Sequence, residues 1–389
     1  MKIAMVFDGL GFGGIERVGL HYVRLLRQKG HEIDIYNVKP AFYEMEQEYP
    51  QDINIYHVNI TDLMMPDYYM LMVKRWRWGK YLYPLAYLGT SALMYIKRLA
   101  QGRRKSYDIA IAFSGHFRDL TFVANNFIKA DKKLCWLHGA LLEYMASSCT
   151  YGDLYRKIKN LCVLSEDRQE YALSVNAYLN ELNINHIYNP IPDEKGEPDE
   201  ALMRELERDM GDYILMVGRF ECDKDQKTVI RAKKILSEKY GRNNKLVFVG
   251  GGGSLLEECK AYAKELGLEN EIVFFGPRYD VWNFYTTAGL FVHSSPAEGL
   301  PTVLLEAMKY GVPIVATDSP PGVTEILQND TYGIRCRIGD AGDMAQKIDR
   351  LLGDEELYRH YTRMGAERIK DFTYATIGDK LDKIFEELR

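Results

Sequence analysis

The chain has 389 residues, 47% of them apolar, and a formal net charge of −5, which excludes a disordered or fibrous protein and allows two domains with substantial cores. The six cysteines include no C-x-x-C pair, so a reduced cytosolic compartment with structural thiols is expected. The opening residues predict no secretory signal, and the uncharged run 81–96 is too short to span a membrane.

The first predicted elements are a strand, a glycine-rich loop and a helix. Apolar residues predict a strand over Lys2–Phe7 and, after the loop, an amphipathic helix over Ile15–Lys29. The glycines of the loop spell G-x-G-x-x-G, the dinucleotide fingerprint. An NAD site would also place an acid at the end of the next strand, where this sequence has Asn37. The loop, which includes Gly13 and Gly14, is therefore better interpreted as a turn that accommodates phosphate at a helix N-terminus.

A basic and aromatic segment follows. The 40 residues from Tyr68 to Tyr107 hold nine Lys and Arg and no acid, and residues 1–190 carry a net charge of +4 where the remainder carries −9. Such a segment suits the headgroups of an anionic membrane, and the membrane-facing candidates are Lys74, Arg75, Trp76, Arg77, Trp78 and Lys80. The alternative is ordinary domain helices with buried aromatics and solvated cations. Nucleic acid is disfavoured, because the chain is acidic overall and has no recognised binding motif.

Polar residues follow the next predicted strands. Strands are expected over Tyr107–Ser114, Lys133–Leu137 and Leu161–Leu164, and His116 and His138 come directly after the first two. Open parallel sheets keep their sites at the carboxyl ends of the strands, so both histidines are candidates. A lone histidine is more often structural than catalytic, and the pattern alone leaves both roles open.

Two cations follow the first strand of the second half. A strand over Tyr213–Val217 leads to Arg219 and Lys224, at the start of the next helix. A guanidinium fork and an ammonium at a helix start suit a pyrophosphate. Asp223 and Asp225 flank Lys224 in a D-x-D pattern, a known metal motif, but the central lysine makes a metal site the weaker interpretation. No essential metal is expected.

The most informative stretch is SPAEGLPTVLLEAMKYGVPIVAT. A strand over Ala288–His293 precedes it and another, Val312–Thr317, ends it. Pro301 opens the helix between them, where its missing donor costs nothing and the uncovered amides can meet an anion or a sugar hydroxyl. Glu298 before the helix and Glu306 within it can both point beyond the carboxyl ends of the strands.

Strand, turn, helix and strand in this order predict a parallel βαβ unit. The same order in both halves predicts an α/β fold of two Rossmann-like, doubly wound domains. We expect a first domain over 1–190, a linker with an opening helix over 191–211, a second domain over 212–370 and a last helix within 371–389.

The string EGLPTVLLEAMKYGVPIVATD resembles the donor-site motif of retaining glycosyltransferases of the family-4 kind, which have the GT-B fold. GRFECDKDQ and GFGGIERVGLHYVRLLRQKGHEIDIY are similar to two further motifs of these enzymes. The resemblance covers essentially the whole chain and is densest over 213–327. It implies two domains facing across a cleft, with the last helix returning to the first domain.

The resemblance implies roles for the candidate residues. The catalytic groups would be His138, Glu298, Arg219 and Lys224. The donor would contact Gly13, Gly14, Arg219, Lys224, Arg278, Glu298, Gly299, Leu300, Pro301, Thr302 and Glu306, and the acceptor side would hold Glu16 and His116. The two cations would neutralise the leaving phosphate, Glu306 would hold the ribose, Glu298 and the amides after it would hold the sugar, and His138 would position its C6 region or the reacting centre.

The implied reaction moves a hexosyl or N-acetylhexosaminyl group from a nucleotide diphosphate sugar, a UDP-sugar by default, to an acceptor hydroxyl with retention and without a cofactor. The basic segment favours a lipid-linked glycan acceptor in cell-surface polysaccharide or glycoconjugate synthesis, and a cytoplasmic protein peripherally attached to the inner face of the membrane. A sugar-nucleotide epimerase of the same fold and a non-catalytic partner subunit are the alternatives. A silent subunit would have lost the donor groups, which are all present here.

Overall fold

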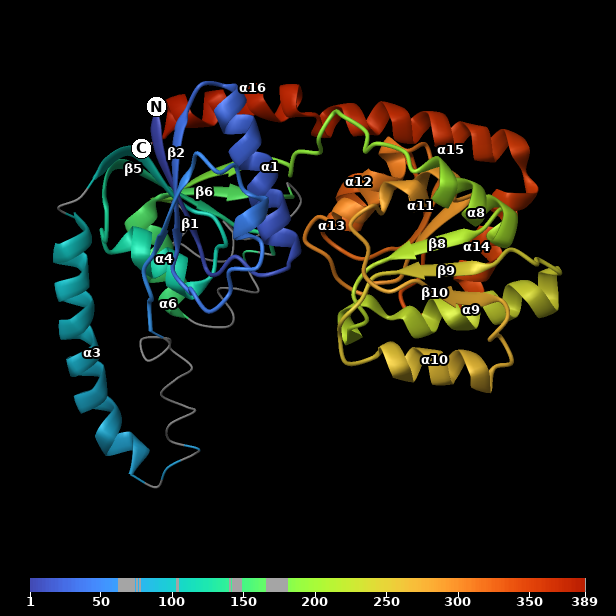
Figure 1. Ribbon diagram of the computed structural model, residues 1–389, viewed down its shortest axis with the longest axis horizontal. Coiled ribbons are helices and arrows are strands. Elements are labelled where there is room, and N and C mark those ends of the chain that lie inside the picture. The colour runs from blue at the N-terminus through green and yellow to red at the C-terminus, as the bar shows by residue number, and fades with distance from the viewer. Residues whose placement is uncertain are drawn as a thin grey trace. The chain divides into compact units, whose positions relative to one another are not determined.

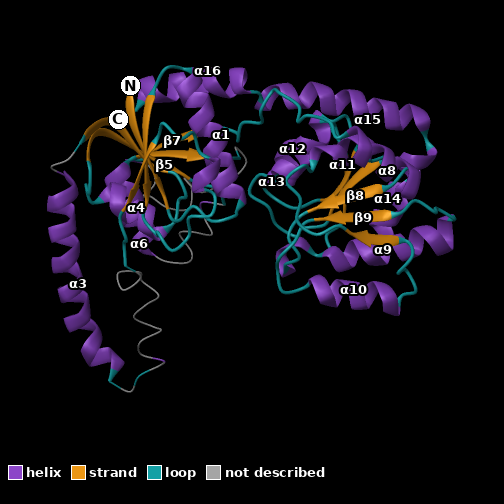
Figure 2. Ribbon diagram, in the orientation of Figure 1, coloured by secondary structure: helices purple, strands orange, loops and turns teal. Residues whose placement is uncertain are grey.

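The structure is a computed structural model that describes residues 1–61, 74, 76, 78–102, 105–139, 141, 149–165 and 181–388. The chain forms two compact units, one of Met1–Pro190 with Ile377–Arg389 and one of Ile191–Thr376. Each unit is built around one parallel sheet flanked by helices (Figures 1 and 2). The two Rossmann-like α/β domains predicted from the sequence are therefore confirmed.

The first unit has a seven-stranded sheet of order β3-β2-β1-β4-β5-β6-β7, in which every neighbouring pair is parallel. The strands are β1 (Lys2–Phe7), β2 (Glu32–Asn37), β3 (Asn54–His57), β4 (Ser106–Ala112), β5 (Lys129–Trp136), β6 (Asn160–Val163) and β7 (Asn183–His186). The helices described in this unit are α1 (Gly14–Gln28), α3 (Gly79–Gly102), α4 (Phe117–Ala124), α6 (Cys149–Ile158) and α16 (Tyr374–Glu387), of which α16 joins the unit from Ile377 onward, and a 3-10 turn is η1 (Glu46–Glu48).

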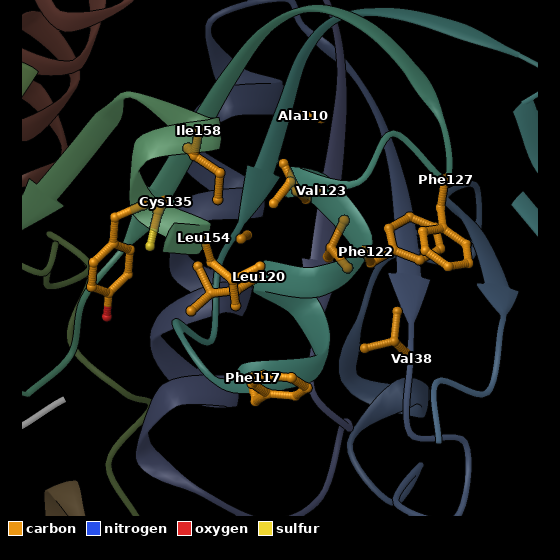
Figure 3. Packing of buried hydrophobic residues seen from close by; sticks show 14 of the residues in the cluster. Val38, Ala110, Phe117, Leu120, Phe122, Val123, Phe127, Cys135, Leu154 and Ile158 are labelled. Carbon is orange, nitrogen blue, oxygen red and sulfur yellow. The ribbon is translucent and has the colours of Figure 1, made fainter. Parts of the chain in front are cut away.

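Alternate residues of the first sheet pack against different helices. Ala4 and Val6 belong to the cluster beneath α4 and α6, where α4 directs Leu120 and Val123 toward α6 (Figure 3). On the other face Trp136 stacks edge-on against Tyr22 of α1, with ring centroids 4.5 Å apart. This two-sided burial explains the nearly continuous apolar composition of β1 and β4.

The last helix packs against the first unit through polar and apolar contacts. Lys29 Nζ lies 2.8 Å from Asp382 Oδ2, and Lys132 Nζ donates to the carbonyl of Leu388 at 2.9 Å. The ring of Phe385 meets the ring of His31 edge-on. The end of the chain is thereby tied to α1 and β5, although it is remote from both in sequence.

The second unit has a six-stranded parallel sheet of order β10-β9-β8-β11-β12-β13. Its strands are β8 (Ile214–Val217), β9 (Leu246–Val249), β10 (Ile272–Phe274), β11 (Leu290–His293), β12 (Ile314–Thr317) and β13 (Ile334–Cys336). Its helices are α8 (Glu200–Met210), α9 (Gln226–Tyr240), α10 (Leu256–Glu265), α11 (Trp282–Thr287), α12 (Thr302–Lys309), α13 (Gly322–Leu327), α14 (Ala341–Gly353) and α15 (Glu355–Arg368), with the 3-10 turns η4 (Cys222–Lys224) and η5 (Ile369–Phe372).

The observed unit boundaries differ from the expected ones at two places. The sequence predicts a linker with an opening helix over 191–211; that helix is α8, the whole stretch belongs to the second unit, and the backbone N–H of the N-cap residue Asp199 donates to Asn283 Oδ1 at 2.9 Å. The division near the end falls between Thr376 and Ile377 rather than at 371, inside α16.

Candidate functional site

The second sheet changes direction between β8 and β11. Its order runs outward on one side through β9 and β10, and on the other through β12 and β13. In doubly wound sheets the ligand crevice lies at the carboxyl ends of the two strands where the order reverses. Arg219 and Lys224 follow β8, and Glu298 follows β11. The sheet topology therefore brings two separately predicted motifs to one place.

Lys224 and Glu298 form a direct ion pair. Lys224 Nζ lies 2.5 Å from Glu298 Oε1, and the two side chains are only 20% and 15% exposed. His293, the last residue of β11, places Nε2 3.2 Å from the same carboxylate oxygen. The backbone carbonyl of Lys224 accepts a hydrogen bond from Ser294 Oγ at 2.7 Å, which joins the two loops a second time.

The surroundings keep the Glu298 carboxylate ionised. Burial alone would raise its pKa, but the hydrogen bond from His293 and the charge of Lys224 outweigh burial and lower the pKa to about 2. A carboxylate that accepts from two donors holds both of them in fixed directions. The cluster can therefore present a fixed negative charge beside a cation to a ligand with hydroxyl groups and phosphates.

Glycines let the neighbouring loops approach closely. Gly250, after β9, has φ +146°, and a Cβ there would lie 2.0 Å from the carbonyl oxygen of Gly218. Gly253 has φ +86°, and its Cβ would lie 2.0 Å from the carbonyl oxygen of Phe220. Only glycine fits such a conformation against a backbone carbonyl. The loops after β8 and β9 are thus packed backbone to backbone beside Arg219.

The other donor-side candidates have mixed surroundings. Arg219 is exposed, and its carbonyl accepts from Gln226 Nε2 at 2.7 Å. Glu306 Oε2 accepts a hydrogen bond at 3.0 Å from Oη of Tyr285, a residue of α11. Arg278 is held by Asp280 in a two-point ion pair, with N–O distances of 2.8 and 2.6 Å. The structure thus joins Lys224 to Glu298 directly, whereas Arg278 and Glu306 have different partners.

The turn before α12 offers backbone amides. Gly299 and Leu300 lead to Pro301, the N-cap residue, which has no side-chain group that could cap the amides of the first turn from Thr302 on. Gly322 packs against Gly299, since a Cβ at Gly322 would lie 2.4 Å from its carbonyl oxygen. Uncapped amides at a helix N-terminus favour an anion or a hydroxyl oxygen.

The first sheet changes direction between β1 and β4, and a second polar cluster follows these strands. Asp8, after β1, accepts from Arg118 Nη1 at 2.9 and 3.2 Å and lies 3.6 Å from His116 Nδ1. Buried Asp119 accepts from the backbone amides of Gly115 and His116, both at 2.8 Å. The Asp119 carboxylate therefore fixes the turn, while Asp8 orients the imidazole of His116.

The surroundings in this cluster shift the pKa values of Asp119 and His116. Burial raises the pKa of Asp119 to about 7, helped by the charge of Asp8 and opposed by His116. Burial lowers the pKa of His116, but the hydrogen bond to Asp8 and the charges of Asp119, Asp8 and Glu16 outweigh burial, so its pKa is raised. A histidine with a raised pKa at a strand end can carry a proton near neutral pH.

His138 is differently placed from His116. Its Nε2 lies 2.8 Å from the carbonyl oxygen of Phe113, so this nitrogen carries the proton and Nδ1 keeps its lone pair. Burial lowers the pKa of His138 to about 4, which keeps the ring neutral. A neutral ring with one free lone pair can accept a hydrogen bond from a hydroxyl group, which suits a positioning role better than proton transfer at neutral pH.

The glycine loop of the first unit leads into α1. Gly13 is the N-cap residue, and a Cβ there would meet the Glu16 carboxylate at 2.2 Å. Gly14 has open space where a side chain would be. Tyr49 Oη donates to the carbonyl of Glu16 at 2.9 Å, which anchors the first turn of the helix. Both glycines and Glu16 thus lie at the same end of the helix.

The predicted membrane-facing residues fall partly within the described part of the chain. Lys74, Trp76, Trp78 and Lys80 are exposed, and Trp76 and Trp78 are among the large apolar side chains that water reaches most freely. Arg75 and Arg77 lie outside the described residues. None of the helices within the described ranges is both long and apolar enough to cross a membrane.

The D-x-D pattern does not converge on one point. Asp223 Oδ2 lies 3.3 Å from Lys224 Nζ, whereas Asp225 Oδ2 accepts from Thr228 Oγ1 at 2.6 Å at the start of α9. Among the residues that the structure describes, no group of three or more His, Cys, Asp or Glu side chains could hold a metal ion.

The sequence analysis missed three residues of the two polar clusters. His293 was treated as the end of an apolar strand, and Asp8 and Arg118 were not weighed as site residues. His293 is the last residue of β11, Asp8 directly follows β1, and Arg118 is the second residue of α4, the helix after β4. The signal that could have found them is the same strand-end rule that selected His116.

Comparisons with known proteins show which proteins this chain is similar to. Residues 199–368 match the family model for glycosyl transferases group 1. The chain is 28% identical over 247 residues to a lipopolysaccharide 1,6-galactosyltransferase of Salmonella typhimurium, covering 61% of this chain and 64% of that protein. It is 29% identical over 160 residues to the N-acetylgalactosamine-N,N'-diacetylbacillosaminyl-diphospho-undecaprenol 4-alpha-N-acetylgalactosaminyltransferase of Campylobacter jejuni, covering 41% and 42%. The chain therefore spans about half the length of these two relatives.

A solved structure extends the comparison to the full chain. The crystal structure of HepE from Anabaena in complex with UDP and glucose superimposes with a TM-score of 0.74 at 18% identity, covering 100% of both chains. At this identity the similarity shows the fold, and it confirms the predicted GT-B architecture. Residues 199–368 therefore match the glycosyl transferases group 1 family model, and the chain as a whole has the GT-B fold.

Proposed function

We propose that this chain is a retaining glycosyltransferase of the family-4 kind, which transfers a hexosyl or N-acetylhexosaminyl group from a nucleotide diphosphate sugar to an acceptor hydroxyl. The observation that carries the proposal is the Lys224–Glu298 pair at the reversal point of the second sheet, 2.5 Å apart and beside the uncapped start of α12. The pair combines a cation for phosphate with a carboxylate for hydroxyl groups. A UDP-sugar is the first donor to test, since the HepE structure of the same fold contains UDP and glucose.

The proposed roles follow from the chemistry of each side chain. The bond between the anomeric carbon and the β-phosphate oxygen breaks, and its electron pair stays on the phosphate, where Arg219 and Lys224 offset the growing charge. The acceptor oxygen bonds to the same face of the anomeric carbon, and its proton passes to the leaving phosphate. Glu298 and the amides of 299–302 bind the donor sugar, and Glu306 binds the ribose. His138, a neutral acceptor, positions the sugar.

The acceptor in this proposal is a lipid-linked glycan. The Campylobacter relative is named for an acceptor on diphospho-undecaprenol, and the Salmonella relative for lipopolysaccharide. The basic segment from Tyr68 to Tyr107 suits the anionic inner face of a membrane, at which such acceptors are held. A peripheral, cytoplasmic-side location follows from this proposal. His116 and Glu16 lie on the acceptor side in the same proposal.

The test measures transfer from UDP-sugars in wild type and in Lys224→Ala and Glu298→Gln. Each variant is expected to lose most transfer activity while staying folded, because each removes one partner of the donor site. Lys227 and Glu258 form a matched control, an ion pair of the same 2.5 Å length on an exposed part of the same unit. Lys227→Ala and Glu258→Gln should keep their activity. Near-normal turnover in both Lys224→Ala and Glu298→Gln would refute the donor site, and donor conversion without acceptor would favour an epimerase.

The proposed reaction requires no metal or other cofactor. Support comes from the divergent partners of Asp223 and Asp225, which leave Lys224 as the charge that meets phosphate. Activity measured with and without EDTA is expected to differ little. Complete loss with the chelator and recovery with manganese would contradict this part of the proposal.

A further inference from the structure

Helix α3 carries a continuous apolar stripe on one face. The members recur at helical spacing and are Tyr81, Leu85, Leu88, Ala92, Tyr95, Ile96 and Leu99. At 100° per residue they fall within an arc of about 100°, one face of the helix. The large side chains among them are between 46% and 69% exposed, and Ala92 is exposed as well. We call this set the outward stripe.

The opposite face holds α3 to the first unit. Met94 is 4% exposed and belongs to the core cluster of the sheet, and Tyr83 and Thr90 on the same side are half-buried. Lys97 Nζ donates to the carbonyl of Asn59 at 2.8 Å. In Figure 1, α3 stands apart from the sheet, and its first turns extend beyond the other labelled elements of its unit. The outward stripe therefore points away from the core that anchors the helix.

The charges around the outward stripe have one sign. Lys80 and Arg98 lie on the same flank of the helix, eighteen residues apart and therefore five turns. The window from Tyr68 to Tyr107 contains no acid in its sequence. Trp76 and Trp78, directly before the helix, are 55% and 65% exposed. Apolar groups, aromatics and cations on one surface match the interfacial layer of an anionic bilayer.

A second copy of the chain fits this surface less well. An isologous contact places the same patch of both copies face to face, which would bring Lys80 and Arg98 of each copy against those of the other. No acid within this window could offset that repulsion. Phosphate headgroups supply the missing negative charge, so charge complementarity selects a lipid surface.

We propose that the outward stripe of α3 enters the interfacial layer of an anionic membrane, with the helix lying in the plane of the bilayer. The inference rests on the proposed function, in which the acceptor is a membrane lipid. It adds a contact that the cations alone do not provide: attachment through α3 persists when salt screens the charges. The helix is about 36 Å long, and it lies along the surface because its buried face is committed to the first unit.

The test compares four forms of the full chain by flotation with vesicles of phosphatidylcholine and phosphatidylglycerol. The first is wild type. The second carries Leu85→Ser, Leu88→Ser and Ile96→Ser, three of the most exposed members of the outward stripe. The control carries Tyr43→Ser, Tyr279→Ser and Ile338→Ser, exposed apolar residues elsewhere on the molecule. A fourth form, Lys74→Ser with Lys80→Ser and Arg98→Ser, removes cations only.

Wild type and the control are expected to float, and the stripe variant to bind at least about tenfold more weakly at low and high salt alike. The cation variant should bind more weakly than wild type at low salt but still float, and it should resemble wild type at high salt, where exposed charges are screened over less than about 8 Å. Equal flotation of wild type and the stripe variant would overturn the inference. So would a wild type that ignores the vesicles and sediments as a dimer that the stripe substitutions dissociate.

Binding of UDP by thermal shift, measured in the same four forms, separates this inference from the proposed function. All four should respond equally to UDP, since the substitutions lie outside the donor site. If no form responds while the flotation pattern is as expected, the donor proposal fails and the membrane surface stands. If every form responds and none floats, the membrane inference fails and the donor proposal stands.

Discussion

Glu298 joins the other residues of the cluster that we propose binds the nucleotide sugar. It accepts from both Lys224 and His293, and its side chain is 15% exposed. Replacing Lys224 or His293 leaves the partly buried Glu298 carboxylate with one hydrogen-bond partner fewer. We expect such a change to lower the free energy of unfolding as well as the activity. His293 acts on a ligand only through Glu298, so it is a positioning residue.

The titration of Glu298 predicts a change of stability at low pH. Its pKa is lowered from 4.5 to about 2 in the folded chain, so the stabilisation is full above the ordinary pKa and disappears as pH falls from about 4.5 to about 2. The free energy at stake is about 3 kcal/mol at most. Urea unfolding at several pH values should show Glu298→Gln less stable than wild type at pH 6 and equally stable near pH 2. A pH-independent difference would contradict the assignment.

His116 offers a second test at the residue scale. Burial lowers the pKa of His116, whereas Asp8, Asp119 and Glu16 raise it, and Arg118 is a cation that pairs with Asp8. Asp8→Asn should lower the pKa of His116, because the hydrogen-bonded charge is removed while the shape is kept. NMR titration of the ring proton measures this directly. An unchanged pKa in Asp8→Asn would show that His116 does not depend on Asp8.

The sequence predicted individual residues better than their contacts. Lys224 and Glu298 were each selected from their own motif, but their 2.5 Å separation depends on β8 and β11 being neighbours, which no local pattern shows. His293 escaped selection because a histidine at the end of LFVH fits a buried strand equally well. Arg118 lies in the first turn of α4, and its contact with Asp8 depends on β1 and β4 being neighbours, which no local pattern shows.

At the scale of elements, the loops after β8 and β9 depend on glycine. Gly252→Ala introduces a Cβ with nothing within 4 Å, so only the strain of its φ of +65° remains. We expect it to lower the free energy of unfolding by about 1 kcal/mol. Gly253→Ala adds a clash at 2.0 Å with the Phe220 carbonyl to a φ of +86°, and we expect a loss of at least about 2–3 kcal/mol. Urea unfolding of both variants checks the ranking. Equal losses would show that the two loops are not packed as described.

Elements with strong periodicity were predicted nearly to the residue. The strand Lys2–Phe7 is β1, and the helix expected over Ile15–Lys29 is α1, one residue earlier at each end. The short strands β3, β7 and β13 were not predicted, since polar or charged residues interrupt NIYH, NINH and IRC, whereas the equally short β8 is wholly apolar. For α3 the sequence showed aromatics and cations, but which side faces the core depends on Met94 and its tertiary neighbours.

At the scale of the molecule, both units repeat one design. Each has a parallel sheet with a reversal point, and each carries charged side chains on the loops that follow the two central strands. The first unit holds a histidine with its carboxylates, and the second a lysine with its glutamate. The fold class followed from the repeated order of strand, glycine turn and helix, whereas the unit boundary inside α16 depends on tertiary contacts of the last helix.

The measurement that tests the donor site most directly is a thermal shift of wild type and Lys224→Ala against a panel of nucleotide diphosphate sugars, with Lys227→Ala as control. A bound donor raises the melting temperature by mass action. We predict that UDP-sugars stabilise wild type and Lys227→Ala, and that Lys224→Ala loses most of this stabilisation. No response of wild type to any nucleotide sugar, or an equal response in Lys224→Ala, would contradict the account.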